Sequence, residues 1–330
     1  LGVWACAEVA RAAVAVAKNW RRVDMVSPVI LREAGAEKLD SGAPPRSLRA
    51  SMRRNLYIRS LALGLAVAAA AFASGVWPQW RGAGRDGRME GSAWAESLAE
   101  LVERWRMPLG KSYSGPIVSD DLVVVTETAD DETEGVRALA REDGAEAWRF
   151  TWPGEGSVPF FAKRNGDWIR STPAFDGETL YVGGMEERFF ALDARTGRER
   201  WSVNLPERFD VAPPDFGFAS SPLVDGDDLY LQAANAVIKL DKRTGETIWR
   251  TLESGGSMMS SGAFSSPVLA ILAGRRQLVV QGRYTLQGLD PANGETLWSV
   301  EVSNFRGMNI LTPTVWGGGV FTSSYKNQTY

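Results

Sequence analysis

The stretch KLDKRTGETIW, residues 239–249, decides the fold of this chain because it is one of four similar stretches. The other copies are ALAREDGAEAW (138–148), ALDARTGRERW (191–201) and GLDPANGETLW (288–298). Their tryptophans, at positions 148, 201, 249 and 298, lie 53, 48 and 49 residues apart. Self-similarity at a nearly fixed period indicates a repeat architecture.

A second marker precedes each copy, and it shows how many strands a repeat holds. Its five occurrences are SGPIVSDDLVVV (114–125), STPAFDGETLYV (171–182), SSPLVDGDDLYL (220–231), SSPVLAILAGRRQLVV (265–280) and LTPTVWGGGVFT (311–322). In the third repeat we expect four strands, at 221–225, 228–233, 236–240 and 246–251. Four antiparallel strands per repeat predict an all-β propeller, with four full blades and part of a fifth present here. The even spacing argues against a two-sheet sandwich.

The recurring tryptophans and turn glycines suit packing between blades better than a ligand cage. A residue that occurs once per blade on the outer strand most simply contacts the next blade, and the glycines permit a left-handed turn. The segment ERWR (103–106) resembles the last strand of a blade, so we expect it to complete the final blade. We assign blade docking to Trp105, Trp148, Trp201, Trp249, Trp298, Gly197, Gly245 and Gly294.

The N-terminal part predicts export. Residues 52–73 combine a positive start at Arg53 and Arg54 with an apolar run, Leu61–Ala73, and a small-residue cleavage site near Ala73/Ser74. That run is too short to cross a membrane. We therefore expect an upstream or leader segment at 1–51, a signal peptide at 52–73, an extension at 74–102 and a C-terminally truncated propeller at 103–330. The mature protein would be periplasmic or secreted, without a transmembrane span.

Composition excludes several classes of function. The chain has no histidine and one cysteine, Cys6, which removes the usual serine and cysteine triads and most zinc sites. After residue 73 the chain holds 26 basic and 35 acidic residues, a net charge of −9. So acidic a surface argues against nucleic acid as the partner.

At the repeat motifs the chain resembles the pyrroloquinoline-quinone (PQQ)-like propeller repeat family, from Trp105 to Tyr330. The family pattern is leucine-aspartate, two variable positions, threonine-glycine, and tryptophan four residues later. The run WPQWRGAGRDG (77–87) is similar to the opening of exported bacterial members named after the outer membrane protein assembly factor BamB. The resemblance implies seven or eight blades in a complete member and tryptophans that dock blades.

The resemblance also raises the question of a cofactor. Quinoprotein dehydrogenases of similar fold hold PQQ with calcium, a base aspartate and often two adjacent cysteines. This sequence has no cysteine pair, and its acids are scattered through turns such as Asp225–Asp228. We therefore expect neither PQQ nor a metal.

The connections between blades carry the candidate binding residues. They span 152–170, 206–219, 254–264 and 303–310, and in a propeller they gather on one face. Exposed aromatic residues beside arginine suit a recognition patch, but the same residues could fold inward and plug the channel. The candidate partner-binding residues are Phe161, Trp168, Arg170, Phe216, Phe218, Phe264, Phe305, Arg306 and Asn309.

From these observations we expect an exported, non-catalytic scaffold that binds a protein or peptide of the cell envelope, in outer-membrane or envelope protein assembly. Two alternatives stay open. One is a quinoprotein-like, PQQ-dependent oxidoreductase whose decisive residues lie in blades outside this chain. The other is a sensor that binds a small molecule or glycan at the mouth of the channel, where these connections gather.

Overall fold

A computed structural model of the chain describes residues 75–89, 97, 99, 101–130, 132–154, 156, 158–258, 260–326 and 329. The predicted leader, signal peptide and cleavage site lie outside these residues. The chain divides into two units, Leu1–Leu63 and Gly64–Tyr330, and all described residues belong to the second. In the described part, no helix has the length and apolar character that a membrane crossing requires.

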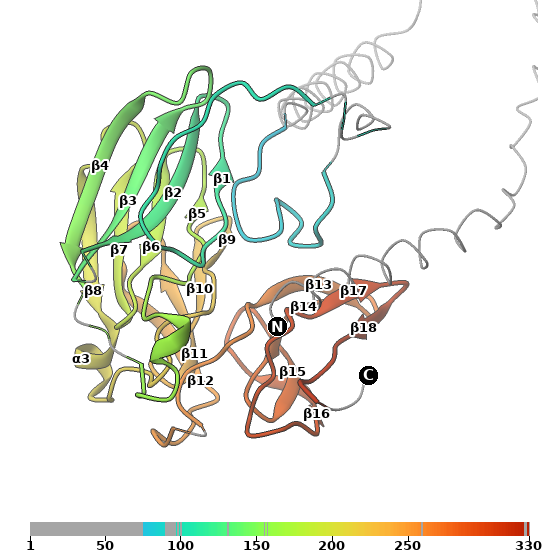
Figure 1. Cartoon of the computed structure of the whole chain (residues 1–330). Helices are drawn as coiled ribbons and strands as arrows, with labels where there is room; N and C mark the ends of the chain where they lie inside the picture. Colours follow the sequence, from blue (N-terminus) through green and yellow to red (C-terminus); the bar gives the residue numbers. More distant parts are fainter. Residues whose placement is uncertain are drawn as a thin grey trace, which may run out of the picture. The chain divides into compact units, whose positions relative to one another are not determined.

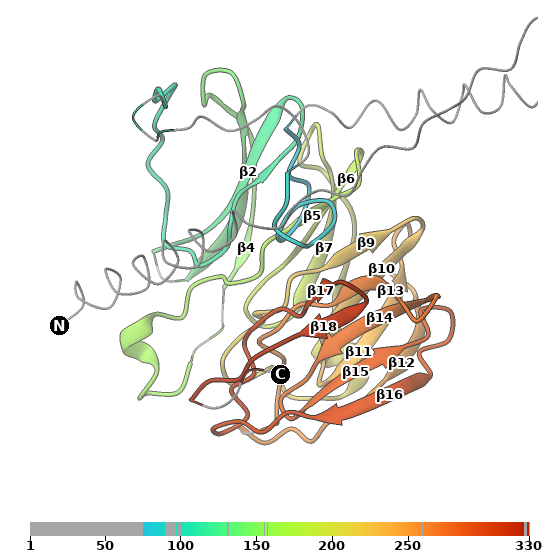
Figure 2. The same ribbon diagram turned by 90° about the vertical axis from the view of Figure 1, so that its right-hand side faces the viewer.

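The described residues form four four-stranded antiparallel sheets and one two-stranded sheet (Figure 1; a second view in Figure 2). In each sheet the strands lie in sequence order, so every strand pairs with its neighbours along the chain. The prediction of an all-β propeller with four-stranded blades is confirmed. The strands are β1 Ile117–Val118, β2 Leu122–Ala129, β3 Thr133–Ala140, β4 Glu146–Pro153, β5 Ala174–Phe175, β6 Thr179–Gly183, β7 Arg188–Asp193, β8 Glu199–Asn204, β9 Leu223–Asp225, β10 Asp228–Ala233, β11 Ala236–Asp241, β12 Thr247–Thr251, β13 Val268–Leu272, β14 Arg275–Gln281, β15 Thr285–Leu289, β16 Thr296–Glu301, β17 Thr314–Trp316 and β18 Gly319–Phe321.

The hydrophobic core lies between consecutive sheets. Val136 of the first sheet packs in one cluster with Phe190 of the second, and both are almost fully buried. Tyr230 of the third sheet packs with Leu278 of the fourth. Because strand residues alternate between two faces, each middle strand can bury apolar side chains against both neighbouring sheets.

Every four-stranded sheet contains the same β-bulge, one residue before the repeat tryptophan. In the third sheet Lys239 pairs with Trp249, whereas the next residue, Leu240, pairs with Thr247. The register shifts at the corresponding place in the other three sheets. A bulge bends its strand and redirects the side chain that follows, so the fixed spacing before each tryptophan serves a fixed geometry.

The tryptophans join each sheet to the next. Trp148 is 9% exposed, and its Nε1 donates to the carbonyl oxygen of Ala194 at 2.9 Å. Gly197 has a φ of +71°, and a Cβ at this position would lie 2.5 Å from the Trp148 ring. The turn therefore needs glycine both for its backbone and for ring contact. The same contacts recur at Trp201 with Lys242 and Gly245, and at Trp249 with Pro291 and Gly294.

Trp105 makes this contact from outside a strand. Its Nε1 donates to Arg141 O at 3.1 Å, and a Cβ on Gly144 would lie 2.7 Å from its ring. Residues 101–110 form no strand in this structure, and the expectation that 103–106 completes the final blade stays a prediction. A strand requires a neighbouring strand to pair with, and the first pairing after this segment is the isolated bridge between Lys111 and Thr128.

Hydroxyl groups connect the inner strands. The backbone N–H of Gly115 donates to Thr172 Oγ1 at 2.9 Å, that of Thr172 donates to Ser221 Oγ at 3.1 Å, and that of Ser221 donates to Ser266 Oγ at 2.9 Å. Each accepting hydroxyl belongs to the residue before the marker proline. The marker residues thus supply one hydrogen bond between each pair of consecutive sheets, from the first sheet to the fourth.

The segment 77–87 lies along these inner strands. Trp77 pairs with Val118 at the inner edge of the first sheet, and the N–H of Phe175 donates to Pro78 O at 2.8 Å. Trp80 Nε1 donates to Thr312 Oγ1, just before β17, at 3.0 Å.

Arg85 fastens the same segment to the third sheet. It is 2% exposed and donates to Pro222 O at 2.6 Å and Ser221 O at 3.1 Å. Burial, with a smaller contribution from Arg81, lowers the pKa of its guanidinium to about 9. The segment therefore contacts the inner edges of the first, second, third and fifth sheets.

Replacing a docking tryptophan should destabilise the protein. We expect Trp249→Ala to lower the free energy of unfolding by about 3–5 kcal/mol, because it removes ring packing and the hydrogen bond to Pro291. Urea unfolding measures the change. Ile248→Ala, at a side chain on the same strand that is 50% exposed, is the control and should cost less than about 1 kcal/mol. Equal losses for the two variants would contradict the docking role.

Candidate functional site

Three connections between sheets meet through a row of phenylalanine rings. In Figure 1 the connections after β4, β8 and β12 lie at the same end of their sheets. The ring centroids of Phe160 and Phe161 are 5.6 Å apart, those of Phe161 and Phe216 6.3 Å, and those of Phe216 and Phe264 5.7 Å. We call these four residues the phenylalanine ladder, and the end of the molecule that carries it the loop face.

The ladder is exposed at one end and embedded at the other. Phe160 is 86% exposed and Phe161 57%, whereas Phe216 and Phe264 are half-buried. Edge-to-face contacts of this kind are favourable, but they bury only part of each ring. A continuous exposed apolar strip on a folded protein marks a surface for interaction.

Arg283 closes the embedded end of the ladder. This residue lies in the turn between β14 and β15, and its guanidinium carbon is 4.2 Å from the centroid of the Phe264 ring. It donates to Ser261 O at 2.8 Å and to Met258 O at 3.3 Å. Its side chain is almost fully buried, and burial lowers the pKa of the guanidinium. The structure therefore holds a buried cation directly beside the ladder.

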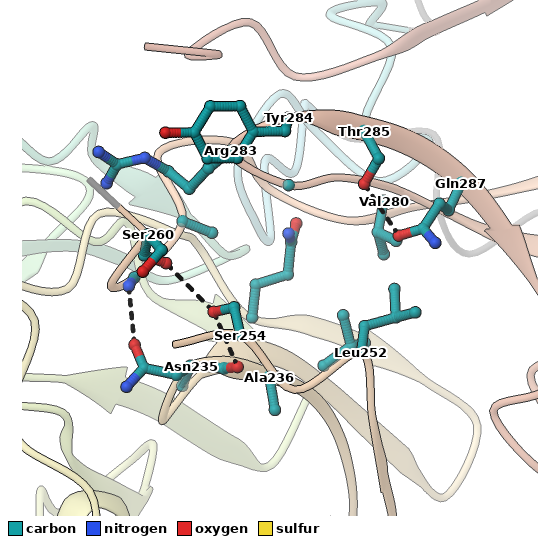
Figure 3. Close-up of a pocket in the computed structure, with 16 residues that line it drawn as sticks. Asn235, Ala236, Leu252, Ser254, Ser260, Val280, Arg283, Tyr284, Thr285 and Gln287 are labelled. Carbon is teal, nitrogen blue, oxygen red and sulfur yellow. Dashed lines mark hydrogen bonds between the residues drawn. The ribbon is translucent and has the colours of Figure 1, made fainter. Parts of the chain in front are cut away.

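A cavity of about 140 Å³ lies next to Arg283, between the third and fourth sheets (Figure 3). Its apolar lining includes Leu252 and Val280, and its polar lining includes Asn235, Ser254 and Gln232. Two hydrogen bonds hold the polar part of this lining in place: Gly262 N donates to Asn235 Oδ1 at 3.0 Å, and Ser254 Oγ donates to Asn235 O at 3.2 Å.

Gln232 is the most deeply placed polar residue of the cavity lining. It is 4% exposed, and its Nε2 donates to Gln281 O at 3.2 Å, but its Oε1 has no hydrogen-bond partner among the described residues. Buried acceptors are normally paired, so this oxygen is an exception in the cavity lining.

Trp168 and Arg170 belong to a separate cluster around Tyr113. The Tyr113 and Trp168 rings stack at 5.4 Å, and the Arg170 guanidinium lies 5.1 Å from the Tyr113 centroid. Sequence reasoning missed Tyr113, although a signal was present. Tyr113, Arg170 and Phe264 all stand three residues before a marker proline.

Phe305 and Arg306 form a third cluster, after the fourth sheet. The Phe305 ring is 6.3 Å from that of Tyr325, and both Arg306 and Lys326 place a cation about 5 Å from the Phe305 centroid. Phe305 is 40% exposed. Seven of the nine candidate residues are thus divided among three clusters, and they do not form a single patch.

Two candidate residues are buried, which corrects their placement on a binding rim. Phe218 is 2% exposed and packs with Phe189 in the core between the second and third sheets. Asn309 is fully buried, and its Nδ2 donates to Arg283 O at 3.2 Å. For these two residues the plugging interpretation applies, because the adjoining sheet edges cover their side chains.

Sequence reasoning also missed a pair of buried acids on the loop face. Glu134 accepts from Trp152 Nε1 at 2.8 Å and from Met185 N of the next sheet at 3.1 Å. Glu187 holds the equivalent position in the second sheet and accepts from Ala234 N at 2.8 Å. Burial is the main cause that raises the pKa of each carboxyl to about 7.

A family model described as outer membrane protein assembly factor BamB matches residues 132–330, more than half of the chain. The chain belongs to this family. Its PQQ-like repeats are therefore the repeats found above, which confirms the resemblance seen in the sequence.

The chain is also similar to proteins of other kinds. The serine/threonine-protein kinase AfsK of Streptomyces griseus is 31% identical over 138 residues, which cover 42% of this chain and 15% of the kinase. Quinoprotein ethanol dehydrogenase of Pseudomonas aeruginosa is 28% identical over 132 residues, covering 36% and 20%. The crystal structure of BamB from Moraxella catarrhalis has a TM-score of 0.43 at 18% identity, covering 66% of this chain and 56% of that one. The chain thus spans a fifth or less of these two curated relatives.

The described residues of this BamB-family chain do not fit a calcium–PQQ centre. Calcium takes six to eight oxygen ligands, largely from carboxylates. Within the described ranges, no three histidine, cysteine, aspartate or glutamate side chains come together in a group that could hold a metal. Turn aspartates pair with basic side chains instead, as Asp193 does with Arg200 at 2.8 Å and Asp290 with Arg275 at 2.5 Å.

The buried acids make stability depend on pH. Because the folded carboxyls of Glu134 and Glu187 keep their protons to about pH 7, and the unfolded ones only to about 4.5, the folded state binds more protons between these values. Their contribution to stability is therefore full below pH 4.5 and is lost as the pH rises to about 7.

We expect the urea concentration at the unfolding midpoint to decrease as the pH is raised from 5 to 7.5. In the Glu187→Gln variant this midpoint should decrease less steeply with pH. The chain has no histidine, so few other groups titrate in this range. Glu246→Gln, at an exposed carboxyl, is the control and should keep the wild-type slope. A Glu187→Gln slope equal to that of the wild type would contradict the assignment.

Proposed function

We propose that this chain is an exported, non-catalytic BamB-family propeller that binds an extended polypeptide segment on its loop face, in the assembly of cell-envelope proteins. The observation that carries the proposal is the phenylalanine ladder. Three separate connections bring its four rings into one row, and the outer two remain largely exposed.

The free energy of exposed aromatic rings supports this proposal. Burial of one phenylalanine side chain stabilises a protein by about 1.5–3 kcal/mol, so Phe160 and Phe161 leave a favourable contribution unused in the free protein. A partner that covers both rings gains that contribution. Phe216 and Phe264, which are half-buried, resemble the packed centre of an interface, where most binding energy is concentrated.

The proposal also names the process in which the chain takes part, the assembly of envelope proteins. The family description names an outer membrane protein assembly factor, and the predicted signal peptide at 52–73 provides a route out of the cytoplasm. A row of rings can contact successive side chains of an extended segment.

Photo-crosslinking tests where the partner binds. With p-benzoyl-phenylalanine at position 161, irradiation of bacteria that export the protein should give adducts with envelope polypeptides. Position 271 is the control, because Ile271 is 70% exposed on β13, beside the turn at 272–275, away from the ladder. Adducts at 271 with none at 161 would place the partner on the opposite end and overturn the proposal.

A second candidate function is a PQQ-dependent oxidoreductase, favoured by the similarity to quinoprotein ethanol dehydrogenase. We propose that this chain binds no PQQ, because its described residues assemble no carboxylate group for calcium. Titration calorimetry with PQQ and calcium together should therefore show no binding at micromolar concentration. Saturable heat with a micromolar or lower Kd would support the oxidoreductase instead.

A further inference from the structure

Two exposed arginines and the buried Arg283 have different kinds of partner. At the end opposite the loop face, Arg243 pairs with Asp241 at 3.2 Å and Arg276 with Asp225 at 2.6 Å, although both arginines are well exposed. Arg283 on the loop face is only 6% exposed, yet it forms no ion pair with any described residue. The buried Arg283 thus has only neutral hydrogen-bond partners among the described residues, whereas the exposed Arg243 and Arg276 pair with carboxylates.

The hydrogen bonds of Arg283 include none to a carboxylate of the described residues. Its two terminal nitrogens donate to the carbonyl oxygens of Ser261 and Met258, and its Nε has no partner among the described residues. Asp215 acts on the guanidinium electrostatically without forming an ion pair with it, and this carboxylate accepts from Ser261 Oγ at 3.0 Å. A buried charge that makes no direct ion pair is costly, and an incoming carboxylate would reduce that cost.

Two exposed basic side chains on the loop face also lack an ion pair among the described residues. Arg306 and Lys326 lie over the Phe305 ring, and neither forms an ion pair within the described part of the chain. Arg250 is an exception, because it pairs with Glu253 at 2.6 Å. The loop face therefore offers aromatic rings together with cations that lack carboxylates.

The cavity beside Arg283 limits the size of the occupant. A cavity of about 140 Å³ is close to one of about 150 Å³ that binds a molecule of the size of benzene. It is smaller than the usual range for cofactors and drug-sized ligands, about 300–1,000 Å³. One side chain of a bound polypeptide fits this volume.

We propose that the polypeptide bound by the ladder is acidic as well as aromatic, and that one of its carboxylates pairs with Arg283 at the cavity between the third and fourth sheets. This inference rests on the proposed function, since it names the chemistry of the segment that the loop face binds. Apolar side chains of the segment cover Phe160 to Phe264, and the acidic side chain follows where the ladder ends. Arginine suits this role because its planar fork matches a carboxylate.

Fluorescence anisotropy with three labelled peptides of nine residues tests the inference. All three share phenylalanine at alternate positions, and the remaining positions carry glutamate, glutamine or lysine. The wild-type chain should bind the glutamate peptide at least tenfold more tightly than the glutamine peptide, and the lysine peptide least tightly. Only the glutamate peptide should lose affinity when sodium chloride is raised from 50 to 300 mM.

Variants locate the effect. Arg283→Gln should bring the affinities for the glutamate and glutamine peptides within about twofold of each other, whereas Arg283→Lys should retain part of the preference. Arg243→Gln, at an exposed arginine of the opposite end, is the matched control and should leave both affinities unchanged. If Arg283→Gln does not fold, the salt dependence of the wild-type chain and the Arg283→Lys variant still decide the question.

The outcomes separate this inference from the proposed function. Equal wild-type affinity for the glutamate and glutamine peptides would overturn the acidic anchor and leave polypeptide binding intact. A glutamate preference that survives in Arg283→Gln would also overturn it. Failure of all three peptides to bind, together with no adducts at position 161, would overturn both.

Discussion

The contact between an indole ring and a turn glycine is the constraint on which the rest of this structure depends. Each four-stranded sheet is hydrophobic on both faces and is stable only when neighbouring sheets cover it. The bulge before each tryptophan directs the ring, as at Trp148, against a turn where Gly197 leaves room, and the indole N–H fixes the distance. Any larger residue at the glycine would separate two sheets and open the core between them.

This docking divides chemical roles between the two ends of the sheets. The glycine turns require short, regular connections, and aspartates such as Asp193 and Asp241 stabilise them by accepting from backbone N–H groups. The loop face carries the connections to the next sheet, which are long and irregular. Those connections are free to vary, and there the chain places its exposed rings and its buried cation, Arg283.

The inner edges are held by a different means. Hydroxyls of the marker residues accept hydrogen bonds from one sheet to the next, and the segment 77–87 runs across several of these edges. Arg85 reaches carbonyl oxygens in the third sheet while Trp80 reaches Thr312. A segment near the start of the described chain thus connects repeats that are far apart in sequence, and it restricts their splaying around the centre.

The sequence alone determined the fold, because a repeated spacing reports a repeated local geometry: the predicted strands of the third sheet agree with β9–β12 to within two residues. It also located the connections that carry the candidate site. The tertiary structure decided which residues are accessible. Phe216 lies in the ladder and Phe218, two positions later, lies in the core, because the neighbouring sheet covers only one of them. The burial of Arg283 without a direct ion pair among the described residues could likewise not be predicted from the sequence, since it depends on which groups from other segments surround the guanidinium.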